Sequence, residues 1–252
     1  MLREPRGWLV PMAYATLLAS AVGIFLVPQL LSPTMDTTGI FGRFLVGMVA
    51  TIQAFALVIF APLVGAATIA GERERGTWLS LLGSSVPRHQ IATGKIAAAC
   101  LYVLVLLAVS APMAGLAVLL GAIDLGTIAG LYLAHAVVGC ALACLGVAIS
   151  TLFQRTWTAA LAAIATAGAL SVFSGTLYIA GAAVLAQLST TPDPMALNWL
   201  LWFNPGYGMF LFFAGDTDPH ALTSWWGHFG AMASLGGASF VVTVARLRRL
   251  RD

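Results

Sequence analysis

The side chains best suited to bind a metal lie in one apolar run of the chain. His135, Cys140 and Cys144 all fall within it, and imidazole and thiolate groups are ligands for zinc and copper. On a helix Cys140 and Cys144 share a face, but His135, five residues before Cys140, lies well round the helix. One helix cannot bring the three groups together, so the sequence predicts no metal site.

His135 is also the main ionisable residue within the apolar runs, and Lys95 lies at the edge of another. Ionisable groups inside a membrane usually mark an ion or proton path. A lone histidine in a helix bundle is more often part of a structural hydrogen bond, and we expect that role for His135. The near absence of buried charge argues against an ion-coupled transporter and against an ion channel.

Neither an ATP-binding loop nor a catalytic triad can be assembled from the sequence. A phosphate-binding loop needs a glycine five residues before the glycine that precedes its lysine, and a Ser or Thr after that lysine. Around Gly94-Lys95 these positions are His89 and Ile96. No Ser-His-Asp arrangement has supporting spacing, so we predict that the chain is not an enzyme.

Composition decides the class of protein that these residues belong to. Of the 252 residues, 60% are hydrophobic and 8% are charged, and the mean hydropathy is +0.94. Soluble domains carry roughly 25% charged residues, so this is a polytopic membrane protein. Cys100, Cys140 and Cys144 lie in apolar spans, which argues against disulfides. The net charge of +3 comes from basic residues at the ends of spans and indicates no nucleic-acid partner.

We predict one all-α transmembrane domain covering residues 1–252. A span needs ~20 residues, and the apolar runs give six spans at residues 8–31, 45–70, 95–121, 127–152, 156–180 and 225–245. The first run continues without a cleavage site and is an uncleaved span. Small residues at Gly126 and Gly130, and in the run Thr156 to Gly168, would let helices approach closely.

The basic residues fix the orientation. With both termini in the cytoplasm, the inside segments hold all but one of the 12 Lys and Arg residues, the exception being Arg43. This bias requires an even number of crossings. The outer segments instead carry Asp36, Asp124, Asp193, Asp216 and Asp218.

The apolar segment 198–215 would be a seventh span by hydropathy alone. A seventh span would place the basic tail RLRRLRD outside, against the charge bias. The segment is also interrupted at Asn204, Pro205 and Gly206, a strong turn signal. We therefore predict a re-entrant helical hairpin in the outer leaflet, resting on the other spans or on a partner subunit.

The longest charged interruption of the apolar pattern is the segment from Gly71 to Lys95. It contains Glu72-Arg73-Glu74-Arg75, then a short amphipathic piece from Thr77 to Leu82, and a turn at Pro87 to His89. A membrane anchor in which Glu72 pairs with Arg75 would need only a few residues. This longer loop presents Leu79, Leu81 and Leu82, and we interpret it as a docking surface for a soluble partner.

The chain resembles the permeases of type-2 ABC exporters, which carry a pattern of the form E-R-E-x-G-T-x-x-x-L-L-x-S-x-P-x-x-R-x-x-I-x-x-G-K between their second and third spans. In this segment the chain reads Glu72-Arg73-Glu74-Arg75-Gly76-Thr77, then Leu81-Leu82, Ser84-Ser85, Pro87-Arg88, Ile91 and Gly94-Lys95. The six spans and the Asn204-Pro205 break after the fifth span also agree with that family.

The resemblance implies a division of labour. A separate cytoplasmic ABC ATPase would bind ATP and magnesium, so this chain would need no cofactor. A second permease chain, identical or related, would complete the path, and the surrounding lipid would be the remaining partner. The coupling segment would be residues 71–94, with the contacts to the ATPase made by Glu72, Arg73, Glu74, Arg75, Gly76, Thr77, Leu81, Leu82, Pro87 and Arg88.

The cargo is inferred less directly. Members of the family export drugs and antibiotics, lipids, polysaccharides and peptides. A path lined by Ala, Gly, Leu and Phe favours an amphipathic or hydrophobic cargo, such as an antibiotic or a lipid, over a polysaccharide. The bias toward Ala, Gly and Leu suggests a GC-rich bacterial genome, so we expect the chain in the bacterial inner membrane. Three alternatives stay open: export of a polysaccharide, a lipid-modifying membrane enzyme, and a non-transporting assembly protein.

Overall fold

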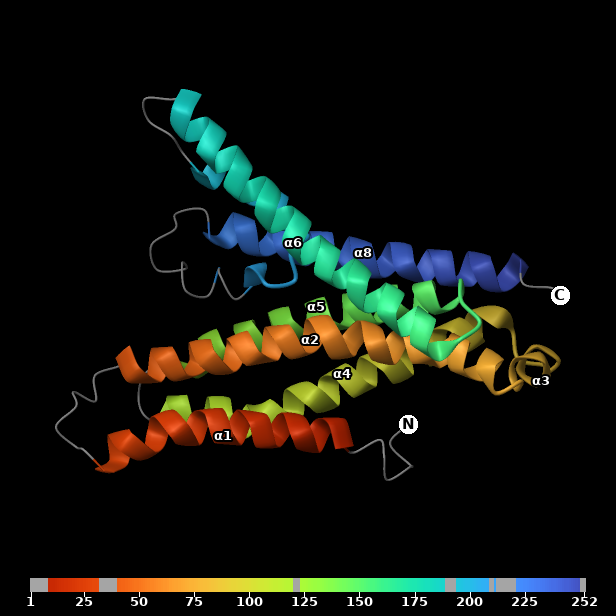
Figure 1. Ribbon diagram of the computed structural model, residues 1–252, viewed down its shortest axis with the longest axis horizontal. Helices are drawn as coiled ribbons and strands as arrows, with labels where there is room; N and C mark the ends of the chain where they lie inside the picture. Colours follow the sequence, from red (N-terminus) through yellow and green to blue (C-terminus); the bar gives the residue numbers. More distant parts are fainter. Residues whose placement is uncertain are drawn as a thin grey trace.

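The protein is a bundle of long helices. The computed structural model describes residues 9–31, 40–119, 123–188, 194–208, 211 and 221–249, and every regular element among them is helical. Two short elements, α3 (Trp78–Leu82) and the 3₁₀-helix η2 (Pro194–Leu201), connect the long helices (Figure 1). The long helices are α1 (Leu9–Leu31), α2 (Ile40–Glu74), α4 (Arg88–Leu119), α5 (Leu125–Ser150), α6 (Thr156–Leu188) and α8 (Ala221–Arg249).

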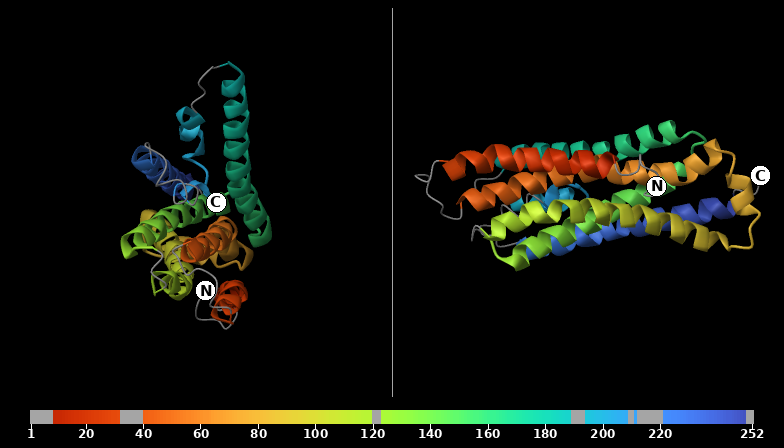
Figure 2. Two further views of the ribbon diagram at one scale, coloured as in Figure 1. Left: turned by 90° about the vertical axis from the view of Figure 1, so that its left-hand side faces the viewer. Right: turned by 90° about the horizontal axis from the view of Figure 1, so that it is seen from below.

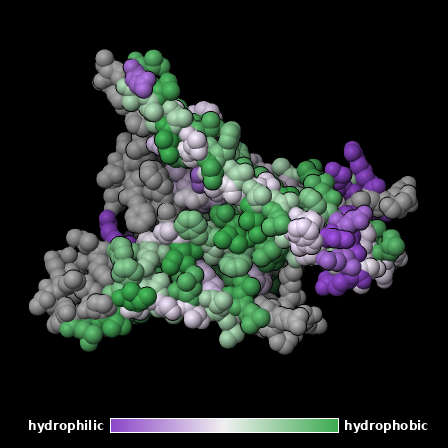
Figure 3. All heavy atoms as spheres, viewed as in Figure 1, coloured by the Kyte–Doolittle hydropathy of each residue, from purple (hydrophilic) through white to green (hydrophobic). Residues whose placement is uncertain are grey.

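In the part of the chain that the structure describes, six helices are long and apolar enough to cross a membrane, in agreement with the predicted number of spans. The membrane-crossing portions are Leu9–Val27, Gly42–Glu74, Arg88–Leu116, Leu125–Ser150, Thr156–Leu188 and Ser224–Arg249. Together with the all-helical fold, they make this a multi-pass membrane protein. The hydropathy view shows an apolar surface across the bundle, and hydrophilic atoms gather where α3 and the C-terminal end of α8 lie (Figure 3). We call this the charged end.

Several helices extend beyond the predicted spans. α2 runs from Ile40 to Glu74 instead of 45–70, and α6 continues to Leu188 instead of ending at residue 180. The turn predicted at Pro87 to His89 is wrong after Pro87, because α4 begins at Arg88. The Pro87 carbonyl accepts hydrogen bonds from the backbone N–H groups of Gln90 (2.9 Å) and Ile91 (3.2 Å), which closes the first turn of α4.

α5 lies at the centre of the bundle. Of the residues in the apolar stretch of α5, 72% are buried inside the protein, whereas only 6% are buried in the corresponding stretch of α6. One side of α5 packs on α2 and another on α8. The first of these contacts is very close: a Cβ on Gly65 would lie 2.2 Å from the Ala143 carbonyl oxygen, and one on Gly146 would lie 2.2 Å from that of Pro62.

The sequence predicted close packing through small residues in two helices. The prediction is right for α6 and misplaced for α5. α6 approaches α2 through the small residues near its start, where Ala159, Ala160 and Ala163 pack against Ala66 and Ala70. In α5, however, the predicted glycines do not mark the contact. A Cβ on Gly130 would meet nothing within 4 Å, and one on Gly126 would meet the Asp124 side chain just before the same helix. The neighbouring helices meet α5 nearer the charged end.

α6 diverges from the bundle along its length (Figures 1 and 2). Its distal half exposes large apolar side chains, among them Val172, Phe173 and Ile179, each about two-thirds exposed or more. In a membrane protein such a surface faces lipid or another subunit, because lipid tails are as apolar as these side chains.

The described part of the predicted hairpin consists of η2 and a turn. The Asn204 N–H donates to the Leu201 carbonyl (2.8 Å), and the Tyr207 N–H donates to the Asn204 carbonyl (3.0 Å). The Asn204 side chain donates to the Ser171 carbonyl (2.9 Å) and the Ser174 hydroxyl (3.0 Å) of α6. The break predicted at Asn204, Pro205 and Gly206 thus falls in a turn that rests on α6, and residues 209–210 and 212–215 lie outside the described residues.

Part of the charge pattern behind the predicted orientation lies outside the described residues as well, namely Arg3, Arg6, Asp36, Asp193, Asp216, Asp218 and Arg251.

Candidate functional site: the charged segment between α2 and α4

The site begins where α2 ends, at a glycine. The Gly76 N–H donates to the Arg73 carbonyl and the Thr77 N–H donates to the Glu72 carbonyl, both at 3.0 Å. This pair of hydrogen bonds is the Schellman arrangement, which requires a left-handed residue at its centre. Gly76 has φ +72°, a conformation that glycine adopts without steric cost. The sequence therefore ends α2 here and turns the chain into α3.

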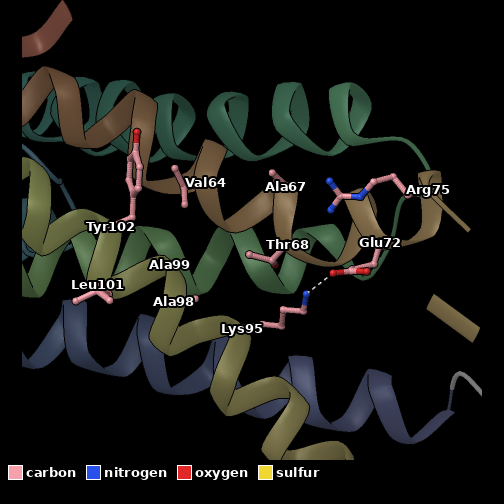
Figure 4. A pocket seen from close by; sticks show the side chains of 10 residues that line it. All are labelled: Val64, Ala67, Thr68, Glu72, Arg75, Lys95, Ala98, Ala99, Leu101 and Tyr102. Carbon is pink, nitrogen blue, oxygen red and sulfur yellow. Dashed lines mark hydrogen bonds and ion pairs between the residues drawn. The ribbon is translucent and has the colours of Figure 1, made fainter. Parts of the chain in front are cut away.

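Glu72 joins the end of α2 to α4. Its Oε1 accepts a hydrogen bond from Lys95 Nζ at 2.9 Å, the ion pair drawn in Figure 4. Its Oε2 accepts a hydrogen bond from the Thr77 hydroxyl. Both carboxylate oxygens thus have partners, and Glu72 pairs with Lys95 of α4; the sequence had suggested a pair with Arg75 only for the simpler membrane-anchor alternative.

Arg73 joins the end of α2 to the end of α5. Its guanidinium donates to the carbonyl of Thr151 (3.0 Å) and to that of Phe153 (3.2 Å), which immediately follow α5. The same group lies 5.4 Å from the centroid of the Trp78 ring in α3. A cation at a helix C-terminus is favourable because the last carbonyls carry partial negative charge. Arg73 therefore holds α2, α3 and α5 together at the charged end.

Glu74 and Arg88 make equivalent contacts to two further helices. The Glu74 carboxylate accepts a hydrogen bond from the backbone N–H of Thr156, the first residue of α6, at 2.9 Å. A carboxylate at this position satisfies one of the open N–H groups of the helix start. The Arg88 guanidinium donates to the carbonyls of Leu247 (3.0 Å) and Arg248 (3.1 Å) near the end of α8.

Four charged side chains of the segment thus reach four different helices: α4, α5, α6 and α8. The sequence located the segment from its charges but did not identify these partners. Most of them are backbone groups more than 70 residues away, and any residue type supplies a backbone carbonyl or N–H. The one available signal was position, because Thr151, Phe153 and Thr156 lie at or between the adjoining ends of two predicted spans.

α3 divides its side chains between the bundle and the outside. Trp78 is buried, and Leu81 and Leu82 are half-buried against the core. Leu79, by contrast, is 73% exposed. Residues three and four apart share a helix face, so Trp78, Leu81 and Leu82 point inward together. Of the three leucines that the sequence suggested for docking, the free chain presents Leu79 most openly.

The buried histidines lie away from this segment. His135 Nδ1 lies 2.8 Å from the Leu131 carbonyl oxygen of its own helix, a structural hydrogen bond of the expected kind. Sequence reasoning passed over His228, which is fully buried in α8 with Nδ1 2.8 Å from the Trp202 carbonyl oxygen. Within the described residues its Nε2 has no hydrogen-bond partner. Its position inside a predicted span was the signal that could have found it.

Gln53 is a second buried polar residue that the sequence analysis did not single out. It lies in α2 with 1% of its surface exposed, and neither amide atom has a partner among the residues that the structure describes. Among the residues that the structure describes, no group of three or more His, Cys, Asp and Glu residues could hold a metal ion.

Comparison with known proteins identifies the family. The family model described as "ABC-2 family transporter protein" matches residues 9–218, which is most of the chain. A search of curated proteins finds no match. The resemblance inferred from the sequence is thereby confirmed, and the chain belongs to the ABC-2 transporter family, as a membrane component.

Proposed function

We propose that the chain is the permease subunit of an ABC exporter, driven by a separate cytoplasmic ATPase. Membership of the family supports a role in transport. The observation that carries the finer proposal is the set of contacts made by Glu72, Arg73, Glu74 and Arg88, which join the charged segment to α4, α5, α6 and α8. A force applied to the segment would therefore reach most of the bundle.

In this mechanism α3 seats in a groove of the ATPase through Leu79 and the neighbouring polar residues. Leu79 and Ser80 are exposed, and Ser84 and Ser85 follow at the surface. Trp78, beneath them, contacts the Arg73 guanidinium, which itself holds the end of α5. Closure of the ATPase dimer on ATP and magnesium would move α3, and hydrogen bonds to charged groups, each worth about 1.5–3 kcal/mol, would carry that movement into the spans.

The proposal includes an orientation. α3 and the C-terminal end of α8 lie together at the charged end (Figures 1 and 3), and Arg246, Arg248 and Arg249 lie in the last turn of α8. Basic residues favour the cytoplasmic side. We therefore place both termini and α3 in the cytoplasm, residues 1–252 in one domain of the bacterial inner membrane, and the hairpin at 198–215 in the outer leaflet.

An amphipathic or hydrophobic cargo, an antibiotic or a lipid, fits a pocket on the open side of the bundle best. A pocket of about 380 Å³ lies between α2, α6 and the turn at Asn204. Its walls are mainly apolar, including Phe55, Val58 and Val172, with Thr51, Ser171 and Asn204 as polar groups. Such a lining suits a ligand that is largely apolar with a few hydrogen-bonding groups. A second permease chain would close the side that α6 leaves open.

Co-purification tests the proposal. The chain is extracted in mild detergent from its native membrane, and the soluble proteins that accompany it are assayed for ATP hydrolysis. We expect a soluble ABC ATPase to accompany the wild type, and Leu79→Asp to release it. Leu125→Asp is the matched control. Leu125 is similarly exposed, but it is the first residue of α5, whereas the charged segment contacts the other end of α5.

Absence of any ATPase from wild-type complexes that retain the helical fold would contradict the proposal and favour a non-transporting assembly protein. The orientation is tested independently by a reporter fused after Asp252 that is active only in the cytoplasm. A reporter that is inactive at this position, together with activity of a second reporter that works only outside the cytoplasm, would overturn the proposed topology.

A further inference from the structure

A second pocket lies between α2 and α4 at the charged end. Its volume is about 300 Å³. Glu72, Arg75 and Lys95 line one end of it (Figure 4). Its other walls are almost wholly apolar and include Val64, Ala98, Leu101 and Tyr102. Leu79 and the polar residues beside it, through which α3 is proposed to seat on the ATPase, do not line this cavity.

The charged end of the pocket carries a surplus positive charge. Lys95 and Glu72 neutralise each other as an ion pair. Arg75 is exposed, and among the described residues its guanidinium makes no ion pair or hydrogen bond; it lies alongside α2 at the edge of the pocket (Figure 4). Among the residues that line the pocket, two cations therefore accompany one carboxylate, which favours an anionic ligand.

The pocket is also graded from charged to apolar along the helix axis. On α2 its lining runs from Arg75 back to Val64, a rise of ~16 Å at ~1.5 Å per residue. The Arg75 end lies at the helix terminus, and the Val64 end lies within the membrane-crossing portion. Leu101, 57% exposed, opens the apolar wall to the bilayer. A phospholipid has the same grading, with its phosphate at the interface and its acyl chains in the hydrocarbon.

We propose that this pocket binds one anionic phospholipid from the adjoining leaflet. Its phosphate lies against Arg75 and Lys95, and an acyl chain follows Ala98, Leu101 and Tyr102. Charge complementarity argues against the chain's own N-terminal segment as the occupant, because Arg3 and Arg6 give that segment the same sign as the pocket. The proposal is independent of the ATPase partner, since its readout is lipid binding by the purified permease alone.

The test measures how many lipids the detergent-purified protein retains, by native mass spectrometry during titration with phosphatidylglycerol, and with phosphatidylcholine as the zwitterionic reference. We expect preferential retention of one phosphatidylglycerol. A basic residue near a membrane surface contributes attraction equivalent to about fivefold in affinity, so Arg75→Gln should weaken binding by about fivefold. Arg246→Gln removes an exposed charge of the same sign at the same end, outside the pocket, and should change binding less than twofold.

A second variant tests the pocket without altering its charges. Ala98 lines the cavity at an exposed position. The larger side chain of Ala98→Phe can therefore occupy the cavity without displacing a packed side chain of the core, and it should also weaken phosphatidylglycerol retention. Equal losses in Arg75→Gln and Arg246→Gln would show general attraction to charge and overturn the proposal. Displacement of the lipid by millimolar inorganic phosphate would show a site for a free anion and would also overturn it.

Discussion

Replacing Gly146 by alanine perturbs the closest contact between helices, the crossing of α5 with α2. The new Cβ would lie 2.2 Å from the Pro62 carbonyl oxygen, whereas ordinary van der Waals contact begins at 3.4 Å. The two helices must therefore separate by roughly 1 Å, the difference between these distances. Overpacking of a close-packed contact costs about 1–3 kcal/mol. For a chain of this length, about 2 kcal/mol corresponds to a fall in Tm of roughly 4–8 °C.

The assay is thermal unfolding of the purified protein in a single detergent. The measured quantity is the fraction of protein that remains monodisperse after heating. Gly130→Ala is the matched control, because Gly130 lies in the same helix and a Cβ there would meet nothing within 4 Å. Its Tm should stay the same or rise slightly, since alanine favours a helix over glycine by up to about 1 kcal/mol. Equal Tm values for Gly146→Ala and Gly130→Ala would refute the close α2–α5 crossing.

Three further predictions concern single residues. Arg73→Gln removes the charged donor at the end of α5, so amide hydrogen exchange over residues 151–155 should accelerate; unchanged exchange there would contradict the capping role. Gly76→Ala places a side chain at φ +72°, a left-handed conformation that costs roughly 1–2 kcal/mol, and should lower Tm by several degrees; a wild-type Tm would show that the turn relaxes freely. Gln53→Leu removes a buried amide without partners among the described residues and should raise stability by about 1–2 kcal/mol, measured as Tm; a loss of stability would instead indicate that water or cargo satisfies the amide.

The number of spans was predictable because it depends on the strongest signal in a membrane-protein sequence, long apolar runs. The helix ends were less so, because a helix does not stop where hydropathy falls. α2 continues through Glu72 to Glu74 and ends only where Gly76 permits the left-handed turn. α4 likewise begins directly after Pro87. Local backbone hydrogen bonds decide these ends, and charged residues satisfy them as well as apolar ones do.

The candidate site could be located from the sequence, but its connections could not. The Glu-Arg-Glu-Arg run is conspicuous in so apolar a chain, and its length indicated more than an anchor. Which helix Arg73 or Arg88 reaches depends on the packing of the bundle and on backbone carbonyls that leave no trace in side-chain pattern. The same holds for Gly65 and Gly146, whose importance comes from the α2–α5 crossing and not from a local repeat.

Site-specific photo-cross-linking from position 79 tests the central claim most directly. A photoreactive residue replaces Leu79 in the full chain, and the same substitution at Leu125 serves as the control. The coupling role predicts that position 79 cross-links to a soluble ABC ATPase in native membranes and that position 125 does not. Absence of any ATPase adduct from position 79, or equal adducts from both positions, would contradict the role of α3 as the coupling helix.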